Sequence, residues 1–198
     1  VRSLPGARSL VTAILRFVLA GMCALAMRLQ LSQPNLSVGD AESYNQLISA
    51  HGVTMIFFFV TIFLTGIANY MVPIMIGARD MAFPKTNALS YWMLPLAILL
   101  VAINPLLGGF DSGWTAYPPL SQQANLGQQA YLMAFVTVGI SSILSSINFL
   151  VNAFSMRAPG MSRMRKTSFA WALTVAATLG QMATAAVAAR ARGLLFGR

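Results

Sequence analysis

Long apolar runs that alternate with short polar segments dominate the pattern of this 198-residue chain. Five of these runs approach the ~20 apolar residues that an α-helix needs to cross a bilayer. The pattern therefore predicts membrane-spanning helices over residues 9–29, 51–77, 90–108, 130–155 and 168–189. The expected fold is an all-α integral membrane protein with one helical domain (9–189), a short N-terminal flank (1–8) and a basic C-terminal tail (190–198).

Several residues inside these runs are unusual for a helix in lipid. Pro95 and Pro105 are expected to kink the third helix. Arg16 lies well inside the first run, where a charge costs about 2.5–3.5 kcal/mol on insertion scales, so it predicts a protein partner against that helix. In the fourth run, Ser142 and Ser145 fall on one side of a helix. This pair favours helix–helix packing, with a wet polar track as the alternative.

The composition excludes an ordinary water-soluble domain. Only 9% of the residues are charged and 57% are hydrophobic, whereas soluble domains are about 25% charged. Lipid is therefore expected to cover much of the surface. The net charge of +9 does not indicate nucleic-acid binding, because the basic residues lie between apolar runs rather than among aromatic residues on one face.

The distribution of basic residues predicts the orientation in the membrane. The N-terminal flank and the segments 78–89 and 156–167 carry most of them: Arg2, Arg8, Arg79, Lys85, Arg157, Arg163, Arg165 and Lys166. Because cytoplasmic loops are enriched in Lys and Arg, the N-terminus is predicted on the cytoplasmic side. Five crossings would place the C-terminus outside, which conflicts with the tail residues Arg190, Arg192 and Arg198. Either the last helix does not cross in the ordinary way, or a partner or the short tail overrides the charge bias.

His51 is the only histidine and stands at the start of the second apolar run. Taken alone, a histidine in such a position is more often hydrogen-bonded at the membrane interface than bound to a metal. Asp80, beside Arg79 in a short polar segment, is by itself typical of a solvated ion pair.

Six longer strings are too specific to follow from membrane insertion alone. They are RLQLSQP (28–34), YNQLISAHGVTMIFFF (44–59), NYMVPIMIGARDMAFPKTNALSYW (69–92), GWTAYPPLS (113–121), GISSILSSINF (139–149) and MRAPGMS (156–162). In this order they resemble subunit I of the haem–copper oxidases, of the cytochrome c oxidase type and in a bacterial style. The resemblance extends over about residues 9–175 and implies a bacterial cytoplasmic (inner) membrane or an equivalent membrane.

The resemblance implies roles for nine residues. His51 corresponds to an iron ligand of the low-spin haem, with Arg28 and Tyr44 in the surroundings of that haem. Asp80 corresponds to the acid at the entrance of a proton-input route. The polar residues that correspond to positions along this route are Asn69, Asn87, Ser141, Ser142 and Asn148. A path through lipid depth needs such hydroxyl and amide groups, because they can order water.

Members of this family have many more membrane helices than five, so the resemblance implies a subunit I truncated to its N-terminal five-helix part. A copper site of the oxidase kind needs several imidazoles, and the chain has one histidine. We therefore expect no copper site, no catalysis by the isolated chain, and haem at His51 only with a second ligand from another chain.

Three functions remain open. We favour an accessory, structural subunit that packs among other membrane subunits of a respiratory or energy-transducing complex. The first alternative is the N-terminal half of a split cytochrome c oxidase subunit I, which supplies a haem ligand and proton-route residues. The second is a haem- or pigment-binding membrane subunit that uses His51 with a ligand from a partner.

Overall fold

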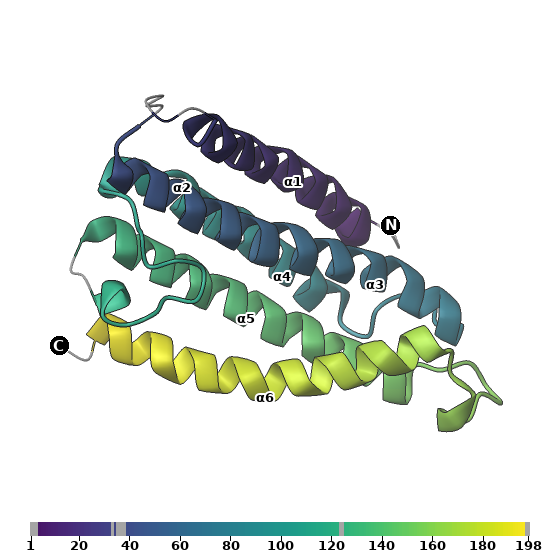
Figure 1. The fold of residues 1–198 in the computed structure, drawn as a ribbon. Coiled ribbons are helices and arrows are strands. Elements are labelled where there is room, and N and C mark those ends of the chain that lie inside the picture. The colour runs from purple at the N-terminus through teal and green to yellow at the C-terminus, as the bar shows by residue number, and fades with distance from the viewer. Residues whose placement is uncertain (1–3, 33, 35–38, 123–124, 197–198) are drawn as a thin grey trace.

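The computed structural model describes residues 4–32, 34, 39–122 and 125–196, and in these ranges the chain forms helices and no strands. The long helices run side by side as a bundle (Figure 1). In chain order the elements are α1 (Leu4–Gln30), α2 (Ala41–Val53), the π-helix η1 (Thr54–Val60), α3 (Thr61–Ile76), α4 (Pro84–Ala102), the 3₁₀ turns η2 (Asn104–Leu107) and η3 (Leu120–Gln122), α5 (Leu126–Ser155), the 3₁₀ turn η4 (Arg163–Arg165) and α6 (Ser168–Phe196).

Within the described residues, five helical segments are long and apolar enough to cross a membrane. They are Pro5–Gln30, Ala41–Ile76, Pro84–Ala102, Leu126–Ser155 and Ser168–Arg190. The predicted all-α membrane fold with five spans is therefore confirmed by length and composition.

The second span begins earlier than predicted, because α2, η1 and α3 form one continuous helix. The Asp40 side chain caps its N-terminus by accepting a hydrogen bond from the Ser43 amide, at 2.8 Å. Residues 41–50 are too polar to register as an apolar run, yet a capped helix includes them. His51 consequently lies ten residues inside a helix that begins at Ala41, and its predicted position at a helix mouth is wrong.

Three other predicted boundaries also differ. α4 begins at Pro84, where a proline suits the first helical position, and ends at Ala102. Pro105 therefore lies in the short 3₁₀ turn η2 and does not kink a membrane helix. α6 continues to Phe196, so the predicted C-terminal tail is largely helical. The tail begins with Arg190, Ala191 and Arg192, and both residue types are strong helix formers.

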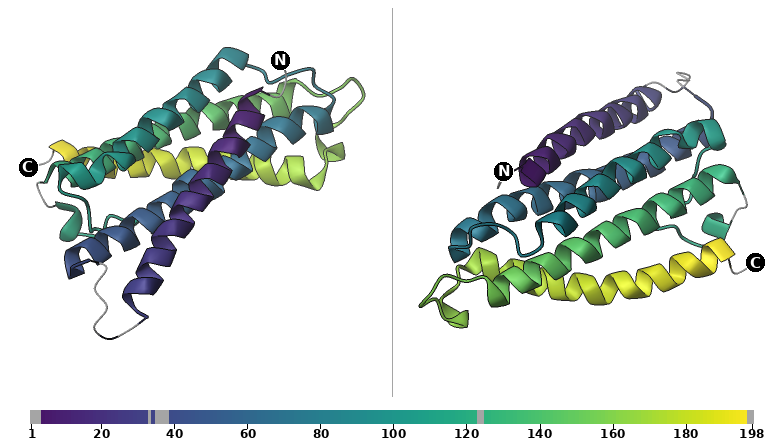
Figure 2. Two further views of the ribbon diagram at one scale, coloured as in Figure 1. Left: turned by 90° about the horizontal axis from the view of Figure 1, so that it is seen from above. Right: turned by 180° about the vertical axis from the view of Figure 1, so that it is seen from behind.

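Glycines set the closest approach between α1 and α3. A Cβ added to Gly6 would lie 3.1 Å from the Gly66 carbonyl oxygen, and one added to Gly66 would lie 3.1 Å from the Leu10 side chain. Small residues at such a crossing let two backbones approach closely. As a result α1 crosses obliquely over the α2–α3 helix (Figure 2).

Aromatic packing holds residues 108–122 over the end of α2 and the start of α5. Phe110 stacks on Tyr131 with a centroid distance of 4.5 Å and an interplanar angle of 7°. The Tyr131 hydroxyl donates to the Trp114 carbonyl at 2.8 Å. Gly127 lies against the backbone of Gly109, with no room for a side chain between them. Contacts with Tyr131 and Gly127 of α5 therefore hold this loop in place.

Basic residues are more numerous at one end of the bundle than at the other, where Arg28, Arg190 and Arg192 lie. The first end, which we call the basic end, holds the start of α1 and the α3–α4 and α5–α6 loops (Figure 1). Its described basic residues are Arg8, Arg79, Lys85, Arg157, Arg163, Arg165 and Lys166. Three of the four acidic residues (Asp40, Glu42 and Asp111) lie toward the other end, where α6 also finishes. Arg2 and Arg198 lie outside the described residues.

Candidate functional site

The His51 ring is oriented by a hydrogen bond to α1. Its Nδ1 lies 2.9 Å from the carbonyl oxygen of Ala20. A carbonyl can only accept, so this contact assigns the proton to Nδ1 and leaves the lone pair on Nε2. The ring is half-buried. A histidine whose other ring nitrogen donates to a backbone carbonyl has the arrangement found in metal-ligating histidines.

The residues after His51 add two features that the sequence pattern did not indicate. Gly52 packs against Trp114, and a Cβ there would lie 3.2 Å from the indole Cδ1 atom. The helix then widens into the π-helix η1, whose end is marked by the Thr61 hydroxyl donating to the Ile56 carbonyl at 2.9 Å. Such π segments are frequent at functional sites, and the wider turn changes which residues face the bundle.

Arg28 and Tyr44 lie on the same two helices, on the side of His51 away from the basic end. Arg28 follows Ala20 on α1 by eight residues, and Tyr44 precedes His51 on α2 by seven. At 1.5 Å per residue these separations are about 12 Å and about 10 Å along the helix axes. Since the two helices run in opposite directions, both side chains lie toward the same end of the bundle (Figure 1).

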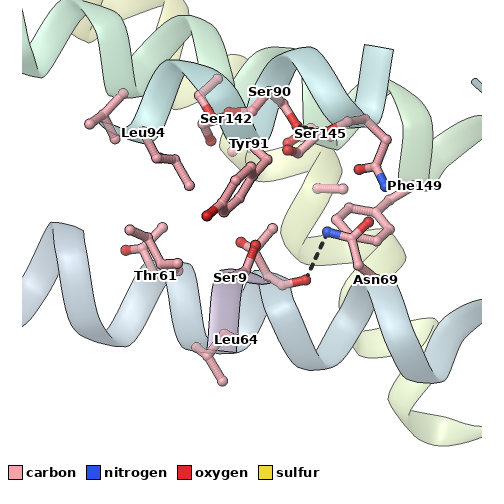
Figure 3. Close-up of a pocket in the computed structure, with 18 of the residues that line it drawn as sticks. Ser9, Thr61, Leu64, Asn69, Ser90, Tyr91, Leu94, Ser142, Ser145 and Phe149 are labelled. Carbon is pink, nitrogen blue, oxygen red and sulfur yellow. Dashed lines mark hydrogen bonds between the residues drawn. The ribbon is translucent and has the colours of Figure 1, made fainter. Parts of the chain in front are cut away.

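A second candidate site is a cavity of about 280 Å³ between α1, α3, α4, α5 and α6. Figure 3 shows that polar side chains from several helices surround this space. Four of the residues predicted for a proton route line it, namely Asn69, Asn87, Ser141 and Ser142. Sequence reasoning did not assign to this route the other polar residues of the lining, namely Ser9, Thr61, Thr65, Ser90, Tyr91, Ser145 and Ser146.

Hydrogen bonds link several groups of the cavity wall. The Ser141 hydroxyl of α5 donates to the Ser90 carbonyl of α4 at 2.7 Å, and the Ser90 hydroxyl donates to the Asn87 carbonyl at 2.8 Å. The Asn69 amide donates to the Thr65 carbonyl at 3.0 Å, the bond drawn as a dashed line in Figure 3.

Two amide oxygens of the cavity wall have no protein partner. These are the Oδ1 atoms of Asn69 and Asn87, both buried. A buried acceptor without a donor costs free energy, and water in the cavity can supply the donor. At ~30 Å³ per molecule of liquid water, the cavity has room for on the order of ten waters.

Two predicted proton-route residues, Asn148 and Asp80, lie outside the cavity lining. Asn148 is fully buried, and its side chain accepts from the Phe83 amide at 2.9 Å and donates to the Phe83 carbonyl at 3.2 Å. It therefore clamps the start of α4 to α5. Asp80 is half-buried in the α3–α4 loop, where its carboxylate accepts from the Met81 amide at 2.8 Å. Neither residue is among those that line the cavity.

Metal-ligating side chains are sparse. In the part of the chain that the structure describes, no group of three or more His, Cys, Asp or Glu side chains is placed to hold a metal ion. His51 is the one histidine of the chain and offers a single nitrogen ligand.

Comparison with known proteins gives consistent matches along the chain. The model of a family described as cytochrome C and quinol oxidase polypeptide I matches residues 5–198. Cytochrome c oxidase subunit 1 of Thermostichus vulcanus is 41% identical over 193 residues, which are 96% of this chain and 35% of that protein. The corresponding subunit of Synechocystis sp. is 36% identical over 184 residues, 92% of this chain and 33% of that protein. Quinol oxidase subunit 1 of Bacillus subtilis is 38% identical over 170 residues, 84% of this chain and 26% of that protein. This chain therefore spans about a third or less of the length of these relatives.

Proposed function

The chain belongs to the cytochrome c and quinol oxidase polypeptide I family, and from this premise we propose that it holds one side of a low-spin haem and carries part of a water path for protons. Haem, when bound, supplies one-electron transfer. A second iron ligand would come from another chain. The chain alone is not an oxidase under this proposal.

The hydrogen bond from His51 Nδ1 to the Ala20 carbonyl is the observation that carries the proposal. An iron ligand must be a neutral imidazole with a free lone pair, and this bond both selects the tautomer and fixes the ring. Among the three functions left open by the sequence, this geometry favours one that still uses His51 for haem. Arg28 and Tyr44, toward the same end of the bundle, are proposed to border the haem edge.

A reduced-minus-oxidised spectrum of the membrane complex that contains this chain tests the haem proposal. His51→Gly should abolish the low-spin haem band, and added free imidazole should restore part of it. Asn45→Ala, an exposed polar position on the same helix, serves as the matched control and should leave the band intact. A full low-spin band in His51→Gly without imidazole would refute the assignment. Identification of the chain that donates the second ligand completes the test.

The cavity lined in part by polar side chains supports the second half of the proposal. Asn69, Asn87, Ser141 and Ser142 surround a space large enough for a chain of waters, and Asp80 lies in the adjoining α3–α4 loop. Ser142→Val and Asp80→Asn should each slow proton uptake by the complex in sealed vesicles while the haem spectrum stays unchanged. Asp111→Asn, a carboxylate toward the opposite end, is the control. Equal proton uptake in all three variants would remove the cavity from the proposal.

The accessory-subunit function is kept as a second candidate because of Arg16. This residue is half-buried in the middle of α1, and none of the described residues forms an ion pair with it. Leu15 and Leu19 beside it are 60% and 47% exposed, which suits contact with lipid or with another membrane subunit. A neighbouring subunit that supplies carbonyl or carboxylate oxygens would stabilise the guanidinium. Arg16→Leu should leave membrane insertion intact and reduce co-purification of partner subunits; unchanged co-purification would count against this candidate.

The orientation is also part of the proposal. We place the basic end on the cytoplasmic side of a bacterial inner membrane or an equivalent membrane, because seven described basic residues lie there and three, Arg28, Arg190 and Arg192, lie toward the other end. A reporter fused at residue 1 should be active in the cytoplasm, and one fused after residue 198 should be active on the other side. The reverse pattern would overturn the orientation.

A further inference from the structure

The α5–α6 loop at the basic end brings together three cations whose arrangement the haem proposal does not use. Lys166 is only 6% exposed, although it is a lysine in a loop. Its ammonium lies 4.1 Å from the Trp171 ring centre and 5.0 Å from the Phe154 ring centre. It also donates to the Thr174 hydroxyl at 3.5 Å. Cation–π contacts of this kind hold a charge in place without neutralising it.

Two arginines lie near this ammonium. The Arg163 guanidinium is 6.0 Å from the centre of the same Phe154 ring. The Nη1 atom of Arg157 is buried and has no protein hydrogen-bond partner. Burial lowers the pKa of Lys166, and the positive charges of Arg157 and Arg163 lower it further. Each arginine is therefore near enough to Lys166 for its positive charge to disfavour the charged ammonium.

The protein does not neutralise this group of charges. The whole chain has only four acidic residues, and Asp80 is the one in a loop at this end. Within the described ranges, no carboxylate comes close enough to Arg157, Arg163 or Lys166 to form an ion pair. Partly buried cations without an anion are costly, and a bound anion would remove that cost.

The loop is held in place by backbone contacts. The Ala158 amide donates to the Ile76 carbonyl at the end of α3 at 2.8 Å, and the Met161 amide donates to the Ala158 carbonyl at 3.1 Å. Met161 also packs against the buried cluster of Val72, Ile76 and Ala170. The three cations are therefore presented by a loop that is fixed against two helices.

The surroundings indicate the kind of anion. The loop joins two helices that are long and apolar enough to cross a membrane. Large apolar side chains beside the cations face outward: Phe154 is 42% exposed, Met164 is 82% exposed and Phe169 is 37% exposed. A ligand here would meet positive charge at the loop and apolar surface along the helices, which matches a phosphate that carries acyl chains.

We propose that Arg157, Arg163 and Lys166 bind the phosphodiester headgroup of an anionic phospholipid, whose acyl chains lie along the outer faces of α5 and α6. The bound lipid neutralises the cations and ties the α5–α6 loop to the membrane surface. The proposal does not depend on haem at His51, so its test and the haem test can fail separately.

Lipid retention by the purified full chain tests this proposal. The protein is exchanged into detergent, supplied with phosphatidylglycerol or phosphatidylcholine, and examined by native mass spectrometry. Phosphatidylglycerol should be retained over phosphatidylcholine. Each of Arg157→Gln, Arg163→Gln and Lys166→Gln should weaken that retention about fivefold, as expected from about 1 kcal/mol per basic residue at an anionic membrane surface. Arg163 is exposed, so its variant should fold normally even if the Lys166 variant does not.

Lys85→Gln is the matched control, because Lys85 is an exposed lysine at the same end of the bundle. Retention by this variant should equal that of the unaltered chain. Equal retention of phosphatidylcholine, or an equal loss in Lys85→Gln, would show that no specific headgroup site exists. Displacement of the lipid by excess inorganic phosphate would assign the site to free phosphate and overturn the lipid proposal.

Discussion

Replacing Asn148 by alanine should loosen the start of α4 from α5, because this one side chain makes two hydrogen bonds to the backbone of Phe83. Asn148 is 0% exposed, so water does not replace the lost amide. Phe83 as a residue is 45% exposed, and both of its bonds to Asn148 are part-buried. We expect the loss of two net hydrogen bonds, about 2 kcal/mol in all.

Asn152→Ala is the control for this measurement. Asn152 is equally buried on the same helix, but its amide donates to the Met81 sulfur, a weak acceptor, and its Oδ1 has no partner. Both substitutions remove the same atoms and leave a similar cavity. The difference between the two variants therefore isolates the bonds to the Phe83 backbone.

Thermal unfolding of the detergent-solubilised chain gives the measurement. For a chain of this size, about 2 kcal/mol corresponds to a fall of about 4–8 °C in melting temperature. Asn148→Ala should fall by this amount below Asn152→Ala. Equal melting temperatures would refute the clamp that we assign to Asn148 and would return it to the candidates for the water path.

Three further predictions follow from contacts of the fold. Gly66→Val should separate α1 from α3 and expose α1 to proteolysis, because its Cβ would lie 3.1 Å from α1 side-chain atoms; Gly21→Val, with nothing within 4 Å of its Cβ, should not. Gly127→Ala should displace the loop residues 108–122 and lower the yield of folded protein, whereas Gly139→Ala, whose Cβ would lie 3.5 Å from its nearest neighbour, should be tolerated. Asp40→Ala should lower the melting temperature at neutral pH by removing the α2 cap. Because hydrogen bonding within the first turn lowers the pKa of Asp40 below its ordinary 3.8, the stabilisation is present above that value. It is lost as the pH falls through the lowered pKa, so the two proteins should melt alike in strong acid.

The sequence predicted the number of apolar helices correctly but not all of their boundaries. Hydropathy is a sum over neighbouring residues, so it found all five crossings. It placed the start of the second span at residue 51 instead of Ala41, because a polar stretch can be helical without being apolar. Helix caps and backbone hydrogen bonds, which do not depend on hydropathy, decide such ends.

The candidate site was predictable in its residue types and not in its arrangement. Asn87 and Asn148 are both asparagines in apolar runs, yet one lines a cavity and the other clamps a backbone. For Ser142 and Ser145 the residues favoured helix packing over a wet polar track, and the structure places both at the cavity wall. The sequence counted Lys166 only among the basic residues of the 156–167 segment, and the structure buries it against two aromatic rings.

The sequence alone indicated that lipid covers much of the surface, how many apolar helices there are, and that a single histidine is available. Each of these is a local or additive property of the residues. Only the tertiary structure decided which atoms meet: the carbonyl that accepts from the His51 ring, the helices that line the cavity, and the aromatic rings that contact Lys166 in the α5–α6 loop. These depend on the rotation and tilt of helices far apart in the chain. One widened π turn rotates all residues after it by about 100° relative to those before it, and no count of apolar residues records that rotation.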